Sequence, residues 1–159
     1  MSTPATYSAE EWQEIVNAPV LAGMLVIASD PAIFGSIKES AAIAKTINEY
    51  GKTSEVELIR EVGQAMSGEN KPHMPDLPRK EGPEVVIKTL VEKCRAAAKI
   101  VQEKSPAEAD AYSRYLIDVA KRTAESSKEG GFLGIGATRV SEQEKVAVKQ
   151  LADALGVEP

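Results

Sequence analysis

The sequence predicts an all-α fold, on three observations. The 159 residues are 43% hydrophobic and 27% charged, a balance typical of a soluble globular protein with one core. Alanine is abundant and only 4% of the residues are aromatic, which favours helix because alanine is the strongest helix former and sheets draw on bulky branched residues. The nine prolines are grouped and leave long proline-free stretches, where we expect the helices.

The first two predicted helices lie on either side of Pro19. Ser8 and Glu11 have the spacing of a capping box, in which the hydroxyl and the carboxylate each accept a backbone N–H, so a helix is expected to start there. Pro19 suits the first turn of a second helix. From Val20 to Ala28 the chain is apolar on every side, which predicts a core helix that is buried all round.

Two more helices complete the first half of the chain. Pro31 ends the core helix, because proline cannot continue an α-helix. Ser36 and Glu39 repeat the capping-box spacing and begin the next helix, whose expected left-handed stop is Gly51. A fourth helix is expected from Thr53 to about Ser67.

A polar segment between residues 68 and 83 separates the two halves. Three of its prolines recur at every third position, which suits an extended polyproline-type connector: Pro72, Pro75 and Pro78. We therefore predict a single domain over residues 1–159, with halves 8–67 and 83–157 joined by this connector.

Three helices are expected in the second half. An apolar stripe with helical spacing runs from Val86 to Val101. Pro106 opens the next helix, which repeats the pattern. Ser141 with Glu144 caps the last helix, and Gly156 is its stop.

The predicted helices number about seven, and their caps indicate a repeat. Two groups of cap and stop residues have the same spacing along the sequence: Ser36, Glu39 and Gly51 in the first half, and Ser141, Glu144 and Gly156 in the second. Two such helical hairpins related by a pseudo-twofold axis would pack as one bundle. The alternative is that this cap spacing is simply common among helices of similar length.

Charge and cysteine content exclude several classes of protein. The 24 acidic and 19 basic residues leave a net charge of −5, so we expect no nucleic-acid partner, because such binding depends on clustered Lys and Arg. One cysteine cannot form an intrachain disulfide, which favours a reducing cytoplasm. The longest apolar run is shorter than the ~20 residues that span a bilayer, so no membrane span is predicted.

Acidic residues flank both predicted hairpin turns. Asp30 and Glu39 flank the first, and Glu129 and Glu144 flank the second. Carboxylates that converge in this way can bind a hard cation such as Mg²⁺ or Ca²⁺. The alternative is helix capping, because carboxylates near helix N-termini are stabilising without any ligand.

The glycine-rich segment 130–136 is the most unusual in the chain. Glycines before a helix can cradle a phosphate with backbone N–H groups, but the segment lacks the Gly-Lys-Ser/Thr ending of a P-loop and follows a helix rather than a strand. The other interpretation, which we favour, is an ordered loop whose apolar residues dock on the core or on a partner: Phe132, Leu133 and Ile135.

The residues do not supply a catalytic set. The single histidine, His73, lies in the proline-rich connector, and the single cysteine, Cys94, lies in an apolar stripe, where it behaves as a small hydrophobic side chain. A Ser/His/Asp triad would have to recruit the histidine from the connector. We predict a protein without enzymatic activity; the alternative is an enzyme or binding protein that uses residues 130–136 for a phosphorylated small molecule.

Two segments resemble the TerB-like tellurite-resistance family. Residues 120–157 resemble the second half of that domain. In this segment a helix leads through an acidic-glycine turn to Ser141, Glu144 and a final helix. Residues 20–50 resemble the first half, with Ala-Ser-Asp at the turn in place of the family's Ala-Asp-Gly. The resemblance covers about half of the chain. It implies an all-helical, cytoplasmic stress protein that binds divalent metal through acidic residues, without established enzymatic activity.

The resemblance also implies which residues would hold the metal. Asp30 and Glu39 match the first turn, Glu144 matches the second, and Glu129 stands where the family has an aspartate before glycine. The sequence departs from the family at both turns: Pro31 replaces the expected turn glycine, and an insertion lengthens the second turn. We predict a TerB-like, stress-associated protein of the cytoplasm that binds a protein partner, a second copy of itself or a divalent cation, with no other cofactor.

Overall fold

The computed structural model describes residues 4–29, 37–68, 76–129 and 142–159; within 37–40 and 127–129 it describes the backbone only. These ranges contain six α-helices, two short 3-10 turns and no strand, which confirms the all-α prediction. The elements are η1 (Pro4–Thr6), α1 (Ala9–Ser29), α2 (Ile37–Thr53), α3 (Glu57–Ser67), η2 (Arg79–Glu81), α4 (Pro83–Lys104), α5 (Pro106–Glu129) and α6 (Glu142–Leu155).

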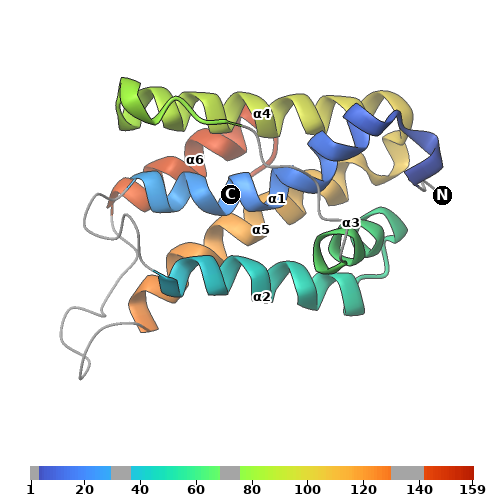
Figure 1. The fold of residues 1–159 in the computed structure, drawn as a ribbon, viewed down its shortest axis with the longest axis horizontal. Helices are drawn as coiled ribbons and strands as arrows, with labels where there is room; N and C mark the ends of the chain where they lie inside the picture. Colours follow the sequence, from blue (N-terminus) through green and yellow to red (C-terminus); the bar gives the residue numbers. More distant parts are fainter. Residues whose placement is uncertain (1–3, 30–36, 69–75, 130–141) are drawn as a thin grey trace.

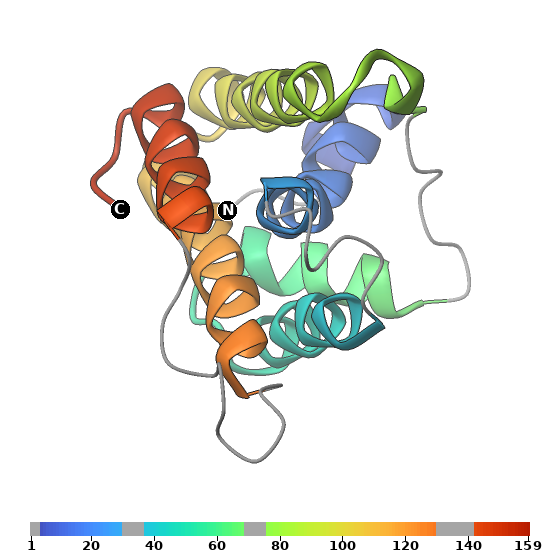
Figure 2. The same ribbon diagram turned by 90° about the vertical axis from the view of Figure 1, so that its left-hand side faces the viewer.

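Helix α1 is the centre of the bundle and contacts each of the other five α-helices. Figure 1 shows α1 between α4 and α2. In Figure 2 it lies in the middle, with α4 above it, α5 and α6 to its left, and α2 and α3 below it. The buried apolar side chains of all six helices form one cluster around it.

The start of α1 has the predicted capping box. The Ser8 N–H donates to Glu11 Oε2 at 2.8 Å, and the Glu11 N–H donates to Ser8 Oγ at 3.1 Å. The same Glu11 oxygen accepts from Lys104 Nζ at 2.5 Å, and this contact, with the Ser8 bonds, lowers the pKa of the Glu11 carboxyl. Glu11 therefore both caps α1 and ties it to the last residue of α4.

Pro19 lies inside α1, so the prediction that it starts a second helix is wrong. A proline in a helix has no N–H for the carbonyl four residues earlier, which here is Ile15. The buried Tyr112 hydroxyl of α5 donates to that carbonyl at 2.7 Å. Because a neighbouring helix supplies the missing donor, the chain continues through Pro19 as one helix, and six α-helices are described where about seven were predicted.

Gly51 does not end a helix, contrary to the prediction, but lies within α2. Its backbone packs against Gly63 of α3: a Cβ built on Gly63 would lie 2.4 Å from the Gly51 Cα and 2.9 Å from the Ile47 carbonyl oxygen. The two glycines allow this close crossing of helices. The helix expected from Thr53 begins instead at Glu57. The proposed repeat required Gly51 to end a helix as Gly156 does, and Gly51 does not do so.

Prolines begin two helices of the second half, and a glycine ends the last helix, as predicted for Pro106 and Gly156. Pro83 and Pro106 are the first residues of α4 and α5. Gly156 has a φ of +70°, and the N–H groups of Gly156 and Val157 donate to Asp153 and Ala152 oxygens at 3.3 and 3.1 Å. This is the pattern of a Schellman motif, so the predicted stop at Gly156 is confirmed.

The connector is described only at its end. Pro72 and Pro75 lie outside the described residues, and Pro78 directly precedes η2.

Helix α1 alone among the described helices is long and apolar enough to cross a membrane, but 61% of its apolar window is buried within the bundle. That burial is typical of the core helix of a globular protein, so the structure contains no clear membrane span in its described ranges.

We predict that Tyr112→Phe destabilises the protein by about 1–3 kcal/mol, the cost of leaving a buried carbonyl without a partner. Tyr115→Phe is the matched control, because Tyr115 lies on the same helix, is 2% exposed, and its hydroxyl has no hydrogen-bond partner among the described residues. That control is expected to be neutral or stabilising. Urea unfolding followed by circular dichroism measures both; equal losses in the two variants would contradict the role of Tyr112.

We also predict that Gly63→Ala lowers the free energy of unfolding by about 1–3 kcal/mol, because the new methyl group would overlap the Gly51 backbone. Gly68→Ala is the control: the nearest described neighbour of its added Cβ would be the Gln64 carbonyl oxygen at 3.5 Å, and its effect is expected within about 0.5 kcal/mol. Thermal unfolding of both variants checks the prediction. A Gly63→Ala protein as stable as wild type would show that α2 and α3 can separate at no cost.

Candidate functional site

The structure describes one of the four predicted metal-ligand side chains. Glu144 lies in the first turn of α6 with 1% of its surface exposed. Asp30 and the side chains of Glu39 and Glu129 lie outside the described residues, so metal binding at these turns stays a prediction. No group of three His, Cys, Asp or Glu side chains in the described ranges is arranged to hold a metal ion.

Of the other predicted site residues, the structure describes Cys94 and does not describe the rest. Phe132, Leu133 and Ile135, with the whole glycine-rich segment, lie outside the described residues, as does His73. Cys94 is fully buried on α4, and its thiol donates to the Ala18 carbonyl at 3.6 Å. Burial raises the pKa of the Cys94 thiol to about 12, so the predicted role as a small core side chain is confirmed.

The core helix is not buried all round, and its half-buried side lines a groove. Val20, Met24 and Ile27 are half-buried rather than buried. Their spacing of four and three residues places them on one face of α1. They line a groove of about 610 Å³ between α1, α2, the end of α3 and the start of α4. The prediction of complete burial is therefore wrong on this face.

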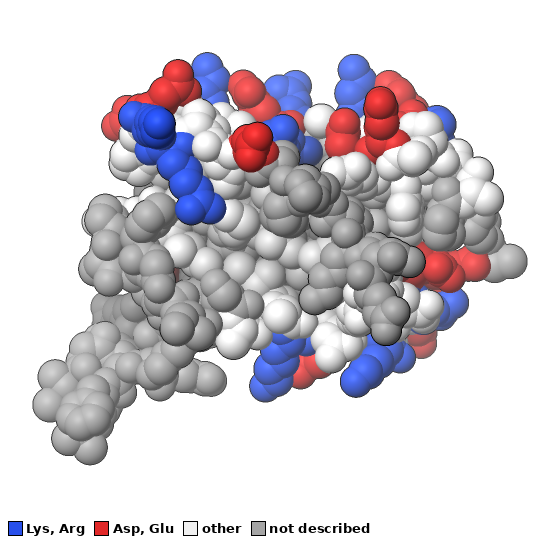
Figure 3. Space-filling model, in the orientation of Figure 1, with Lys and Arg blue, Asp and Glu red and all other residues white. Residues whose placement is uncertain are grey.

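The other walls of the groove come from three helices and η2. Their lining residues are mostly apolar: Ile43, Ala44, Ile47 and Asn48 of α2, Met66 and Ser67 of α3, Val86 and Leu90 of α4, and Arg79 of η2. The Asn48 and Ser67 side chains contact each other, with 3.4 Å between Oδ1 and Oγ. Figure 3 shows the face between α4 and α2: charged side chains follow its upper and lower edges, and the described surface between them is mainly uncharged.

A glycine determines how closely α2 approaches α1 at the groove. A Cβ built on Gly23 would lie 2.4 Å from Cγ1 and 2.5 Å from Cδ1 of Ile43. The absence of a side chain on Gly23 therefore lets Ile43 pack directly on the α1 backbone, beside the groove that Ile43 also lines.

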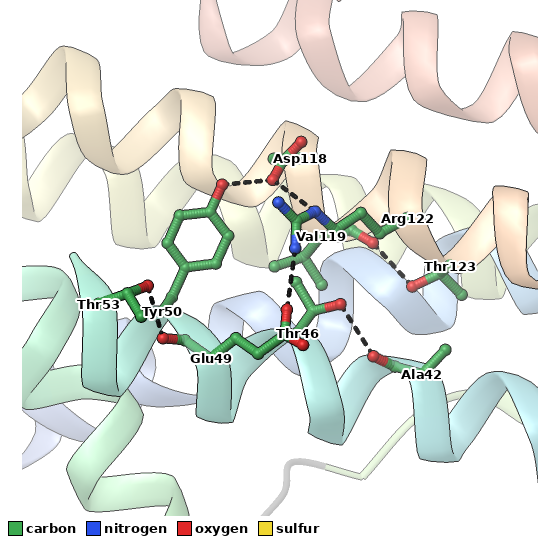
Figure 4. A network of polar contacts seen from close by, with 9 residues as sticks. All are labelled: Ala42, Thr46, Glu49, Tyr50, Thr53, Asp118, Val119, Arg122 and Thr123. Atoms are coloured by element: carbon green, nitrogen blue, oxygen red, sulfur yellow. Dashed lines mark hydrogen bonds and ion pairs between the residues drawn. The ribbon is translucent and has the colours of Figure 1, made fainter.

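A polar network on the opposite side of α2 fixes this helix to α5 (Figure 4). The Tyr50 hydroxyl donates to Asp118 Oδ2. Arg122 contacts the same Asp118 oxygen at 3.0 Å, reaches Glu49 Oε2 at 3.2 Å, and lies over the Tyr50 ring with its guanidinium carbon 5.3 Å from the ring centre. The network therefore holds in place the helix that forms one wall of the groove.

Tyr50 also reports on this network through its pKa. Burial raises the pKa of the Tyr50 hydroxyl to about 12, and the hydrogen bond to Asp118 adds to the effect. Because the folded pKa lies above the ordinary value of about 10, protonated Tyr50 stabilises the folded state. This contribution is fully present below pH 10 and is lost as the pH rises from 10 to 12.

Comparison with known proteins does not identify a relative of this chain. No family model matches it, and neither a curated protein nor a solved structure matches it. The resemblance to the TerB-like family therefore stays a prediction.

We predict that the stability difference between wild type and Tyr50→Phe is about 1 kcal/mol at pH 9, the contribution of one hydrogen bond, and becomes smaller by pH 11.5. In this interval the Tyr50 phenol ionises in the unfolded wild type, at the ordinary pKa of about 10, whereas the folded state keeps the proton until about pH 12. The variant has no phenol at this position. Urea unfolding of both proteins at three pH values between 9 and 11.5 measures the difference. A difference that stays constant over this interval would contradict the assignment.

Proposed function

We propose that this chain is a binding protein, and that the groove beside α1 binds an elongated apolar ligand. The observation that carries the proposal is the half-buried apolar face of the core helix that lines the groove. Val20, Met24 and Ile27 belong to the most apolar of the described helices, yet its neighbours leave them half-buried beside about 610 Å³ of space. Each Å² of apolar surface that a ligand removes from water contributes about 25 cal/mol.

The size and lining of the groove support this function. Small-molecule sites are concave, mainly apolar and about 300–1,000 Å³ in volume, with a few polar groups. Met24 and Met66 contribute flexible side chains, which adapt to ligands of different shape. The role agrees with the expectation from the TerB-like resemblance of a cytoplasmic, non-enzymatic protein that acts by binding, and we keep that expectation as part of the proposal.

A fluorescence titration tests the proposal. N-phenyl-1-naphthylamine is a neutral apolar probe whose emission rises when it leaves water, and we expect saturable binding to the wild type. Ala44→Trp should weaken binding by about tenfold or more, equal to about 1.4 kcal/mol, because Ala44 lines the groove and is exposed. The larger side chain would then occupy the space of the probe.

Ala107→Trp is the matched control, because Ala107 is also an exposed helical alanine but lies on α5, away from the groove. This variant should bind the probe as the wild type does, and both variants should keep the melting temperature. Absence of binding to the wild type, or equal binding by the Ala44→Trp variant, would contradict the proposed function.

A further inference from the structure

The one charged side chain among the described residues of the groove lining is Arg79. It begins η2, the short turn before α4, and is exposed. No carboxylate of the chain forms an ion pair with it in the described ranges. The groove therefore combines apolar walls with a guanidinium that is available to a ligand.

We infer that the groove binds a long-chain monocarboxylate, a free fatty acid, with the hydrocarbon chain along the half-buried apolar face of α1 and the carboxylate on Arg79. The inference rests on the proposed function and adds the chemical class of the ligand. Arginine suits this role because its planar group donates two parallel hydrogen bonds to a carboxylate and stays charged at any physiological pH. A neutral hydrocarbon would leave this donor unused.

The charges around Arg79 favour a single negative charge on the ligand. Lys80 follows Arg79, but three carboxylates lie within five residues of Arg79: Asp76, Glu81 and Glu84. All five side chains are exposed. Two positive and three negative charges give this turn a net charge of −1. Because a phosphate carries up to two negative charges and is bound by clusters of cations, the turn favours a carboxylate over a phosphate monoester.

The apolar walls make the chain of the ligand as important as its carboxylate. Val20, Met24 and Ile27 contact the groove from α1, and Val86 and Leu90 contact it from α4. A short carboxylate such as acetate would meet Arg79 but cover none of this surface. We therefore expect binding to strengthen with chain length, since each methylene group removed from water adds to the affinity.

Displacement of N-phenyl-1-naphthylamine at pH 8 tests the inference with three ligands of equal chain length: dodecanoate, 1-dodecanol and dodecyl phosphate. For the wild type we expect all three to displace the probe, with dodecanoate at least about tenfold tighter than the alcohol and tighter than the phosphate. Arg79→Gln should remove the preference for dodecanoate and leave the affinity for the alcohol unchanged. Lys80→Gln removes the same charge one residue away and should keep the preference.

The outcomes separate the ligand class from the proposed function. Equal affinity of the wild type for dodecanoate and 1-dodecanol, or an unchanged preference in Arg79→Gln, would overturn the inference while the groove remained a binding site. Tighter binding of dodecyl phosphate would also overturn it. If neither the probe nor any of the three ligands bound, the proposed function would fall as well.

Discussion

The carbonyl oxygen of Ile15 is the group on which the arrangement of this protein most directly depends. Pro19 cannot donate to it, and an unpaired carbonyl in the core is costly. The Tyr112 hydroxyl meets it at 2.7 Å from the neighbouring α5, so α1 continues for 21 residues through the proline. Buried residues lie on both sides of Pro19 along this helix, and the part after Pro19 also carries the half-buried face that lines the groove.

Close approaches between backbones then place α2 and α3 around this central helix. Gly23 lets Ile43 pack against α1, and Gly51 and Gly63 let α2 cross α3 at a distance that no side chain would permit. On its other side, α2 is held to α5 through Tyr50. The groove lies where these constraints keep α2 beside α1 without covering all of it, so its shape follows from backbone geometry as well as from the apolar residues that line it.

Local signals in the sequence predicted those helix ends that depend on nearby residues, whereas contacts over long sequence separations were not predictable. The capping box of Ser8 and the stop at Gly156 depend on neighbours within a few residues, and both are present. Pro19 was misassigned because Tyr112, which compensates for it, is 93 positions away along the chain. Gly51 was misassigned because its role is set by Gly63 on another helix.

The groove was not predicted, because it also depends on contacts between helices that are distant in the sequence. An apolar helix predicts burial, but the sequence does not show which face the other helices leave uncovered, nor that Arg79 lines the same space. The cysteine was interpreted correctly because an apolar stripe is a local pattern. The predicted acidic and glycine-rich sites fall largely outside the described residues, so they stay predictions from sequence and resemblance.

A double-mutant cycle between Pro19→Ala and Tyr112→Phe tests the central claim most directly. Pro19→Ala restores the N–H that can pair with the Ile15 carbonyl within the helix. Loss of the Tyr112 hydroxyl should therefore cost less stability in the Pro19→Ala background than in the wild type, with a coupling free energy of about 1 kcal/mol or more from urea unfolding. The same cost in both backgrounds would show that Tyr112 does not compensate for Pro19, and would contradict the account.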